Sequence, residues 1–494
     1  MNSTKVSIET RRFEVAAKRA QGPYPAVKRR DHKDEVEATL RKIPTSRKPL
    51  PLREPAPATK LMDIRGAAGD PREDPVIFYT YTTPSKVGPK NSATNAADIS
   101  GADSEAGVVL MTGNWYCDYS VDGGATFTSV DPTTVFKAWP KHDFCCDQVI
   151  IYVQRIDRFI WFLQHDADSD GIGAFRLAVA SPADIKTKFE TAWTYWEFTA
   201  ATFALSEDMD YPDMAFTSQF LHVSTDATTT GGRLVARFAL SDIAAGGTLP
   251  GSHNHPDKTK DAVGAHLVED SSDGAFWVGE PDNSSFNIYS WPDSSTTVTP
   301  FKVGVAAWPN GALSSLGPNN NDWLQYLSGH VPQNKVCGAT RSGDQLFLAW
   351  TAASGSGTGS GFNFPNAHVR VAVVDAIKQT LVSETQIWNK DYAFAYPSLS
   401  VNAKGDVAIA TGVGGPNNHA HTSFGILGDH VVWHADEGDY TPQRWGDFIT
   451  VRRNQRNRSK FAGFGYFTTK VSGNTGQYFL NPFYVVFGRK SLGP

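Results

Sequence analysis

From about residue 76 onward, short apolar runs alternate with turn residues, and the same order of elements returns along the chain. One unit consists of a short strand, a Gly, Asp or Asn turn, a strongly apolar strand, a polar loop and a further strand. The units recur at intervals of about 40 to 55 residues, which is the spacing of propeller blades. Because a blade packs both faces of its sheet against its neighbours, its middle strands should be continuously apolar. The runs FIWFL at 159–163 and VAIAT at 407–411 have this character.

This recurrence predicts an all-β fold, a β-propeller of seven four-stranded blades in which residues 76–494 form a single domain. The alternative is a pair of β-sandwich domains, which would place turn signals about every 8 to 12 residues without the longer recurrence. The composition fits many strands and turns, because aromatic residues make up 12% of the chain and 43 Gly and 29 Pro lie between the apolar runs.

Residues 1–75 have a different composition, with several basic pairs, a Pro-rich run at 44–60 and few aromatic residues. The net charge of the whole chain is −5, so the remainder is acidic. A segment of this kind cannot bury enough apolar surface to offset its ordering entropy. We therefore expect a flexible basic N-terminal arm, with transient helix around Ile8 to Ala20. Residues 1–60 would dock the protein to an assembly partner, or would be a solvated tail that aids solubility.

Membrane-spanning and secretory segments bear on the compartment of a protein. No apolar stretch approaches the length of about 18 residues that a membrane-spanning helix needs. The first 21 residues lack the apolar segment of a secretory signal, so we expect a cytoplasmic protein, with non-classical secretion or packaging as the alternative. Nucleic acid is not an expected partner of the acidic propeller, and no organic cofactor is expected.

The four cysteines do not form a disulfide framework or a zinc motif. They are Cys117, Cys145, Cys146 and Cys337, and neither CxxC pairing nor zinc spacing occurs among them. Adjacent side chains on a strand point to opposite faces. We therefore expect Cys145 and Cys146 to be two buried thiols, with a vicinal disulfide as the alternative.

The string SVDGGATF, from Ser120 to Phe127, matches the Asp-box pattern SxDxGxTW with Phe in place of Trp. Partial matches occur at 270–277 and 400–406. In this motif the Asp and the hydroxyl side chain satisfy backbone groups of a hairpin turn, a Gly takes the left-handed conformation, and the aromatic ring packs underneath. The motif therefore has a structural role.

With GNWY at 113–116, CCDQ at 145–148, DYPDM at 210–214 and RWGDF at 444–448, the chain resembles the sialidase-like, BNR-repeat propellers, in particular an uncharacterised bacterial branch. The resemblance implies the propeller fold. It implies sialidase activity much less, because sialidases resemble one another by an Arg-Ile-Pro element, and here Arg65 is followed by Gly66 and Arg155-Ile156 by Asp157.

Propellers bind ligands at the mouth of the central channel, where the first strands of the blades converge. Carboxylates near one axis, with Tyr and Arg beside them, could bind a cation or supply a general acid and base for glycan cleavage. The alternative is that these Asp residues satisfy backbone groups at blade turns. The residues that open the blades, and hence the catalytic candidates, are Asp147, Tyr211, Asp213, Arg444 and Asp447.

Two further motifs suggest metal or base chemistry. His419 and His421 would share one face of a strand and could ligate a metal, or pair as a base with Tyr211 or Tyr396 as in lyases on propellers, an expectation that rests on fold analogy. The flanking Gly-Pro-Asn sequence favours a surface loop instead.

The second motif is the DxDxDG spacing that places three oxygens around Ca²⁺ in a tight loop. The twelfth position of an EF-hand loop is Leu177 here, so the alternative is a bare acidic hairpin. The candidate metal ligands are Asp166, Asp168 and Asp170.

Two classes of function remain open. In the first, the protein binds or acts on a glycan or another small polar ligand, as a glycoside hydrolase or polysaccharide lyase, with four tryptophans available for stacking on sugars. In the second, it is a non-catalytic binding, cargo or effector scaffold that docks through its basic arm. The stacking candidates are Trp115, Trp139, Trp308 and Trp445.

Overall fold

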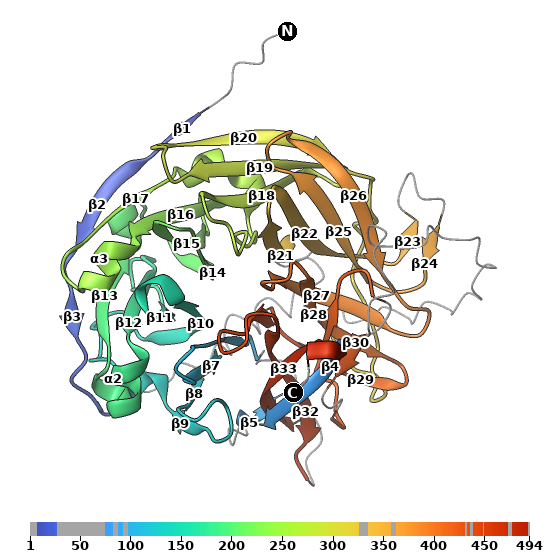
Figure 1. Cartoon of the computed structure of the whole chain (residues 1–494), viewed down its shortest axis with the longest axis horizontal. Coiled ribbons are helices and arrows are strands. Elements are labelled where there is room, and N and C mark those ends of the chain that lie inside the picture. Colours follow the sequence, from blue (N-terminus) through green and yellow to red (C-terminus); the bar gives the residue numbers. More distant parts are fainter. Residues whose placement is uncertain are drawn as a thin grey trace.

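The computed structural model describes residues 7–26, 75–82, 87–91, 97–325, 334–356, 362–429, 432–434, 438–447, 449–472 and 477–492. Within them, six sheets of four or more strands are arranged around a central axis, which makes the protein an all-β propeller (Figure 1). The predicted fold class is confirmed, and the pair of sandwiches is not observed.

The first three sheets follow the chain as antiparallel meanders. The first contains β6 (Ser100–Asp103), β7 (Val109–Gly113), β8 (Tyr116–Ser120) and β9 (Thr128–Val130). The second contains β10 (Phe144–Val153), β11 (Arg158–His165), β12 (Ala174–Ala180) and β13 (Thr194–Thr199). The third contains β14 (Met209–Phe216), β15 (Phe220–Ala227), β16 (Gly232–Ala239) and β17 (Leu249–His253).

The next two sheets have the same organisation. The fourth contains β18 (Gly274–Asp282), β19 (Ser285–Pro292) and β20 (Thr297–Gly304). The fifth contains β21 (Val336–Ser342), β22 (Gln345–Ala352), β25 (His368–Asp375) and β26 (Thr380–Ile387), with the small pair β23 (Gly355–Ser356) and β24 (Asn363–Phe364) inserted. The α-helices of the described chain are the short α2 (Pro182–Thr187) and α3 (Leu240–Ala245).

The last sheet contains nine strands, of which six follow one another in the main order and three pair at its sides. Its first half contains β27 (Ala393–Val401), β28 (Val407–Gly415), β29 (Asn418–Ile426) and β30 (Val432–His434). Its second half contains β31 (Thr450–Arg453), β32 (Phe461–Lys470), β33 (Gln477–Arg489), β4 (Pro75–Thr82) and β5 (Val87–Asn91). The predicted count of seven separate four-stranded blades is therefore not confirmed, because two units share one sheet.

Apolar side chains between the sheets form the core, and the middle strands are buried on both faces as predicted. All seven residues from Phe159 to His165 are buried, as are all nine of β28. Pairing of β33 with β4 joins the C-terminal strand to the strand that begins the propeller, so the ring is closed by hydrogen bonds between the two ends of the domain.

The N-terminal segment is not the transient helix that its composition suggested. Three strands add to the outer edges of three sheets in the order opposite to the chain: β1 (Ile8–Glu9) pairs β20, β2 (Arg11–Val15) pairs β17, and β3 (Lys18–Arg19) pairs β13. We refer to residues 7–26 as the strap. Figure 1 shows the strap running along the outside of these sheets.

The strap is ordered because its few apolar residues are placed one sheet at a time. Ile8 and Ala20 are buried in the clusters of the fourth and second sheets, and Phe13 makes edge-to-face contacts with Phe198 and Phe238. The strap strands also supply hydrogen-bond partners to the edge strands of three sheets. The prediction of a flexible arm is therefore wrong for residues 7–26, whereas residues 27–74 lie outside the described residues.

The hairpin from Ser120 to Phe127 makes the hydrogen bonds that its sequence predicts. The Asp122 carboxylate accepts the Thr126 N–H at 2.9 Å and the Thr126 hydroxyl at 2.6 Å, and the Ser120 hydroxyl accepts the Gly124 N–H at 2.8 Å. Gly123 has φ of 81°, in the region that glycine favours. These bonds, from the Thr126 side chain first, lower the pKa of Asp122 to about 2.

We expect Asp122→Asn to lower the melting temperature at neutral pH, by the equivalent of about 1 kcal/mol of unfolding free energy or less, because this carboxylate is exposed and screened. A carboxyl with a depressed folded pKa stabilises the protein above its unfolded pKa and loses that effect as the pH falls toward about 2. The difference between wild type and variant, measured by thermal melts from pH 7 to pH 2, should therefore vanish at acid pH. A constant difference would contradict this account.

No helix in the described part of the chain is long and apolar enough to cross a membrane.

Candidate active site at the channel mouth

The first strands of several sheets are irregular at one end of the channel, which we call the mouth. The register shifts between Phe144 and Gln148 in β10, between Asp210 and Asp213 in β14, and between Ala395 and Ser398 in β27. A bulge adds a residue without a ladder partner and re-aims the side chains beside it. The strand sequences CCDQ, DYPD and YPS therefore turn polar groups toward the axis.

Some mouth residues adopt a backbone conformation that is unusual for side-chain-bearing residues. Asp98, Tyr211 and Tyr396 have φ values of 42°, 56° and 55°. Left-handed conformations of this kind are costly for bulky residues and persist only where the surroundings fix them. The surroundings at the mouth therefore fix this backbone conformation in all three residues.

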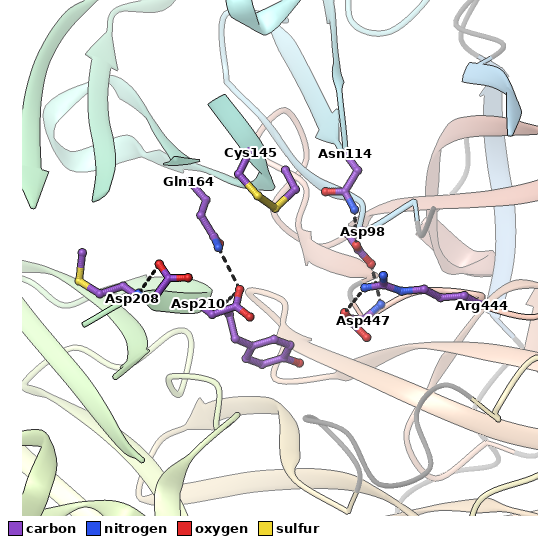
Figure 2. Close-up of a disulfide and its surroundings, with 11 residues drawn as sticks. Asp98, Asn114, Cys145, Gln164, Asp208, Asp210, Arg444 and Asp447 are labelled. Carbon is purple, nitrogen blue, oxygen red and sulfur yellow. Dashed lines mark hydrogen bonds and ion pairs between the residues drawn. A yellow bond between two sulfur atoms is a disulfide. The ribbon is translucent and has the colours of Figure 1, made fainter. Parts of the chain in front are cut away.

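Carboxylates from four parts of the chain meet at the mouth, as Figure 2 shows for Asp98, Asp210 and Asp447 beside Arg444. Asp98 accepts the Asp447 backbone N–H at 2.6 Å and the Asn114 side-chain amide at 2.5 Å. Arg444 Nη2 lies 3.3 Å from Asp447 Oδ2. The fourth carboxyl, that of Asp147, belongs to the bulge of β10 and interacts electrostatically with the other three and with Arg444.

Burial and mutual repulsion keep protons on this cluster. The pKa of Asp447 is raised to about 7 by burial and by the Asp98 carboxylate, against the opposing effect of Arg444. Burial also raises the pKa of Asp147 well above its usual range, and Asp98, Asp210 and Asp447 add to the effect. Near neutral pH the pair Asp147 and Asp447 therefore retains a proton that it can donate.

Asp210 is held as an acceptor beside the cluster. Gln164 Nε2 donates to Asp210 Oδ1 at 2.9 Å, and the Tyr211 backbone N–H donates to the same oxygen at 2.7 Å. Gln164 comes from β11, so neighbouring sheets share this contact (Figure 2). These two hydrogen bonds fix the position of the Asp210 side chain beside the cluster.

Cys145 and Cys146 form a vicinal disulfide at the mouth, with their Cα atoms 3.7 Å apart (Figure 2). The expectation of two thiols was wrong because it assumed a regular strand, on which adjacent side chains diverge. The bulge between Phe144 and Gln148 breaks that alternation. The disulfide places a rigid, apolar surface next to the carboxyl cluster.

Asp213 does not join the carboxyl cluster. Its Oδ2 accepts the Leu267 backbone N–H at 2.7 Å, and its Oδ1 lies 3.9 Å from His266 Nδ1. His266 Nε2 in turn lies 3.3 Å from the Tyr211 hydroxyl. The structure therefore pairs Tyr211 with His266, a residue that the sequence analysis did not single out. Asp213 lies on the other side of the His266 ring, next to Nδ1.

Tyr211 is buried and His266 is half-buried, and their surroundings favour the neutral form of both side chains. Burial raises the pKa of Tyr211 well above its usual range, and the Cys337 and Asp447 groups reinforce this. Burial lowers the pKa of His266, with Asp213 opposing. Transfer of a proton from the neutral phenol to the neutral imidazole would create an ion pair in this site, so burial holds both groups in their neutral, hydrogen-bonded form.

His419 and His421 lie away from this cluster, on the third strand of their sheet. His419 Nδ1 is 3.0 Å from the Thr441 hydroxyl, and His421 Nδ1 is 2.7 Å from the His419 carbonyl oxygen. They are on a strand, as one interpretation predicted, but the structure gives Tyr211 a different histidine partner. Their use as a base or metal ligands stays a prediction.

The DxDxDG loop is a turn in which the Asp168 carboxylate binds backbone groups. Asp168 Oδ1 accepts the Asp170 and Ile172 backbone N–H groups at 2.9 and 3.0 Å, which lowers the pKa of Asp168. Among the described residues, no three His, Cys, Asp or Glu side chains are placed to hold a metal ion. Calcium binding by Asp166, Asp168 and Asp170 stays a prediction.

Two of the four expected sugar-stacking tryptophans are fully buried. Trp308 and Trp445 have exposed fractions of 2% and 0%, and Trp445 packs on Tyr466 with ring centroids 4.6 Å apart. The expectation was wrong for both because residues near a channel can still face the core. Trp115 and Trp139 are half-buried and keep part of their surface in solvent.

Farther along the first strands, ion pairs cross the axis. Arg452 Nη1 lies 2.6 Å from Glu269 Oε1, and Arg453 Nη2 lies 3.1 Å from Asp270 Oδ1. Asp270 Oδ2 also accepts the Val401 backbone N–H at 3.1 Å. These side chains join sheets around the axis. At this depth the carboxylates near the starts of the blades have a structural role, because they bind arginines and backbone groups of other sheets.

Comparisons with known proteins add little beyond the fold. No family model and no curated protein matches the chain. An α-L-arabinofuranosidase from Fusarium graminearum aligns with 85% of this chain and 98% of its own, at 11% identity and a TM-score of 0.38. AofleA from Arthrobotrys oligospora aligns over 76% and 93%, at 11% identity and a TM-score of 0.36. A chain of a mitotic checkpoint complex aligns over 90% and 99%, at 9% identity and a TM-score of 0.41.

The class that the fold defines is thus the β-propeller. Values this low do not place the chain in the sialidase-like branch that the Asp-box suggested, and they carry no statement about its activity.

Proposed function

We propose that the protein binds and cleaves a glycan at the channel mouth, as a glycoside hydrolase or polysaccharide lyase. The observation that carries this proposal is the buried pair Asp147 and Asp447, whose raised pKa values leave a transferable proton near neutral pH. General acid catalysis of glycosidic cleavage needs such a carboxylic acid, and a second carboxylate must act as base or nucleophile. Asp98 and Asp210 are the candidates for the second role.

The charge of the mouth favours a neutral glycan and the hydrolase version. Asp98, Asp147, Asp210 and Asp447 would repel a sugar carboxylate, and Arg444 is already paired with Asp447. A further nearby arginine, Arg233, is fully buried and bound to Asp226 at 2.9 Å. The Tyr211–His266 pair lies at the edge of the same site and can hydrogen-bond a sugar hydroxyl there.

The test is incubation of the protein with a panel of neutral and acidic oligosaccharides and polysaccharides. New reducing ends indicate hydrolysis, and absorbance of an unsaturated product indicates a lyase. We expect hydrolysis of a neutral glycan, and its loss in the double variant Asp147→Asn/Asp447→Asn, with Asp168→Asn as the matched control that stays active. Equal activity in the double variant and wild type would overturn the proposed site.

One observation favours a second candidate, a non-catalytic scaffold. Arg11, Arg12, Arg19 and Lys18, which is paired with Glu197, are exposed in the strap, so strands β2 and β3 present a mainly basic stripe, interrupted by Glu14, at the outer edge of the propeller. A stripe of this kind suits an acidic protein partner. Absence of turnover on the whole panel would favour this candidate.

We also propose that the nine-stranded sheet acts as two blades, which would make seven. Within the described residues the strand ladder between its halves has a single residue pair, His421 with Phe467, beside hydrogen bonds between the Thr422 hydroxyl and the Tyr466 backbone, whereas ten pairs join β32 to β33. Because this ladder is so short, each half can pack as a separate blade.

A further inference from the structure

A hollow lined by both polar and apolar side chains lies in the second sheet, next to the strand that carries the disulfide. It is lined by residues of the 131–143 segment and by the ends of β10, β11 and β12, among them Trp139, His142, His165 and Arg176. Phe144, which pairs with His165 across β10 and β11, is followed directly by Cys145. The hollow is therefore at the same end of the sheet as the mouth.

His165 is buried and directs an unused acceptor into this hollow. The residue is 2% exposed, and its Nδ1 lies 3.0 Å from the His142 carbonyl oxygen, so Nδ1 carries the proton and donates it. Nε2 is left as a buried acceptor with no hydrogen-bond partner among the described residues. Burial first, and Arg176 next, lowers the pKa of His165 well below its usual range, so the ring stays neutral. A buried polar atom without a partner is costly and calls for a ligand or water.

Trp139 supplies a flat apolar surface beside this acceptor. The Arg176 guanidinium lies 5.3 Å from the centre of the Trp139 ring, and the rings of His142 and His165 lie 4.9 and 5.2 Å away. Because Trp139 is half-buried, part of its ring remains open to solvent. His142 Nδ1 lies 3.1 Å from the Asp166 carbonyl oxygen, which leaves its Nε2 for other contacts.

Arg176, which lines the hollow, is paired within the protein. Arg176 Nη2 lies 2.8 Å from Glu197 Oε1 and also donates to the Lys137 carbonyl oxygen at 2.6 Å. Its cation is therefore neutralised inside the protein and not offered to an anion. The enclosed space is about 10 Å³, about the room of one hydroxyl group or water molecule. A ligand that fits is uncharged, has an apolar face, and inserts a single hydroxyl group.

We propose that this hollow is a subsite for a neutral sugar residue, which stacks on Trp139 and donates a hydroxyl hydrogen to His165 Nε2. Aromatic stacking combined with a few fixed polar groups is the usual composition of such sites. The inference rests on the proposed function in taking the ligand to be a glycan, and it deepens that proposal by assigning a second contact point outside the channel.

The experiment is calorimetric titration of neutral oligosaccharides of increasing length into the full chain in the catalytically disabled Asp147→Asn/Asp447→Asn background, so that binding is measured without turnover. Trp139→Ala should weaken binding at least tenfold, and His165→Phe, which keeps a ring and removes the acceptor, about fivefold. Thermal melts establish that each variant is folded, and Trp139→Phe, which keeps a stacking surface, should retain most of the affinity.

The outcomes separate the two proposals. Turnover by wild type together with unchanged binding by Trp139→Ala and His165→Phe overturns the subsite and leaves the proposed activity standing. Glycan binding that depends on Trp139 and His165, without turnover by wild type, supports the subsite and overturns the activity. If no oligosaccharide binds at millimolar concentration, the subsite is wrong, and if wild type also shows no turnover, the proposed activity is wrong as well.

Discussion

Asp447→Asn should abolish glycan turnover and, at the same time, make the folded protein more stable at neutral pH. We expect kcat to fall by about 100-fold or more, as for removal of a general acid or base. The gain in unfolding free energy should be on the order of 1 to 3 kcal/mol, because Asp447 is a buried carboxyl whose pKa is raised to about 7 beside Asp98. Asn removes the repulsion and retains the shape.

The sign of the pH dependence identifies the cause. A carboxyl whose folded pKa is raised binds its proton more tightly in the folded state, so it lowers stability as the pH rises from about 4 to about 7, and the cost is constant above that. The stability advantage of Asp447→Asn should therefore be near zero at pH 4 and greatest above pH 7. Thermal melts of both proteins across this range measure it.

Asp122→Asn is the matched control, because it changes an Asp that serves a turn. Its pKa is lowered to about 2, so this variant should be less stable than wild type near pH 7. If Asp447→Asn is also less stable at pH 7, Asp447 is a structural acceptor and the active site proposed here is wrong.

The propeller could be predicted because its signal is repeated along the chain. Strands such as β11 and β28 are apolar over most of their length, as expected for middle strands that are covered by a neighbouring sheet on each face. The mouth position of Asp147 and Asp447 followed from the same repetition. Both are at the start of a blade unit.

Sequence reasoning failed where a local irregularity re-aims side chains. The bulge in β14 sends Asp210 toward the mouth and Asp213 toward His266, although the two lie three residues apart. Periodicity contains no signal for a bulge, although Tyr-Pro in both β14 and β27 is a clue, since the residue before Pro is restricted. Asp98 had a signal too, because it lies just before a strand that starts a blade unit, as Asp447 does.

The strap was misread for a thermodynamic reason. Its composition is too polar for the segment to fold in isolation. The segment is ordered because the propeller supplies what it lacks: three edges to pair with and apolar places for Ile8, Phe13 and Ala20. Composition alone does not report surfaces elsewhere in the chain.

Removal of residues 1–26 should therefore destabilise the propeller and promote its self-association. The truncation exposes the edges of β13, β17 and β20, and unpaired sheet edges are sites of intermolecular pairing. We expect a loss of roughly 5 kcal/mol in unfolding free energy, measured by urea denaturation, together with concentration-dependent oligomers in sedimentation velocity. A truncated protein that is monomeric and as stable as wild type would show that the strap contributes nothing.

A point substitution isolates the packing part of this effect. Phe13 makes edge-to-face contacts with Phe198, Phe203 and Phe238, so Phe13→Ala should cost about 2 to 4 kcal/mol. Arg12→Ala is the matched control on the same strand, because Arg12 is exposed and should change stability by less than about 0.5 kcal/mol. Backbone pairing is intact in both variants, so Phe13→Ala should lower stability without producing oligomers. If Phe13→Ala also forms oligomers, the Phe13 side chain is needed to keep the strap on the sheet edges. The three short strand pairings are then too weak to hold the strap alone.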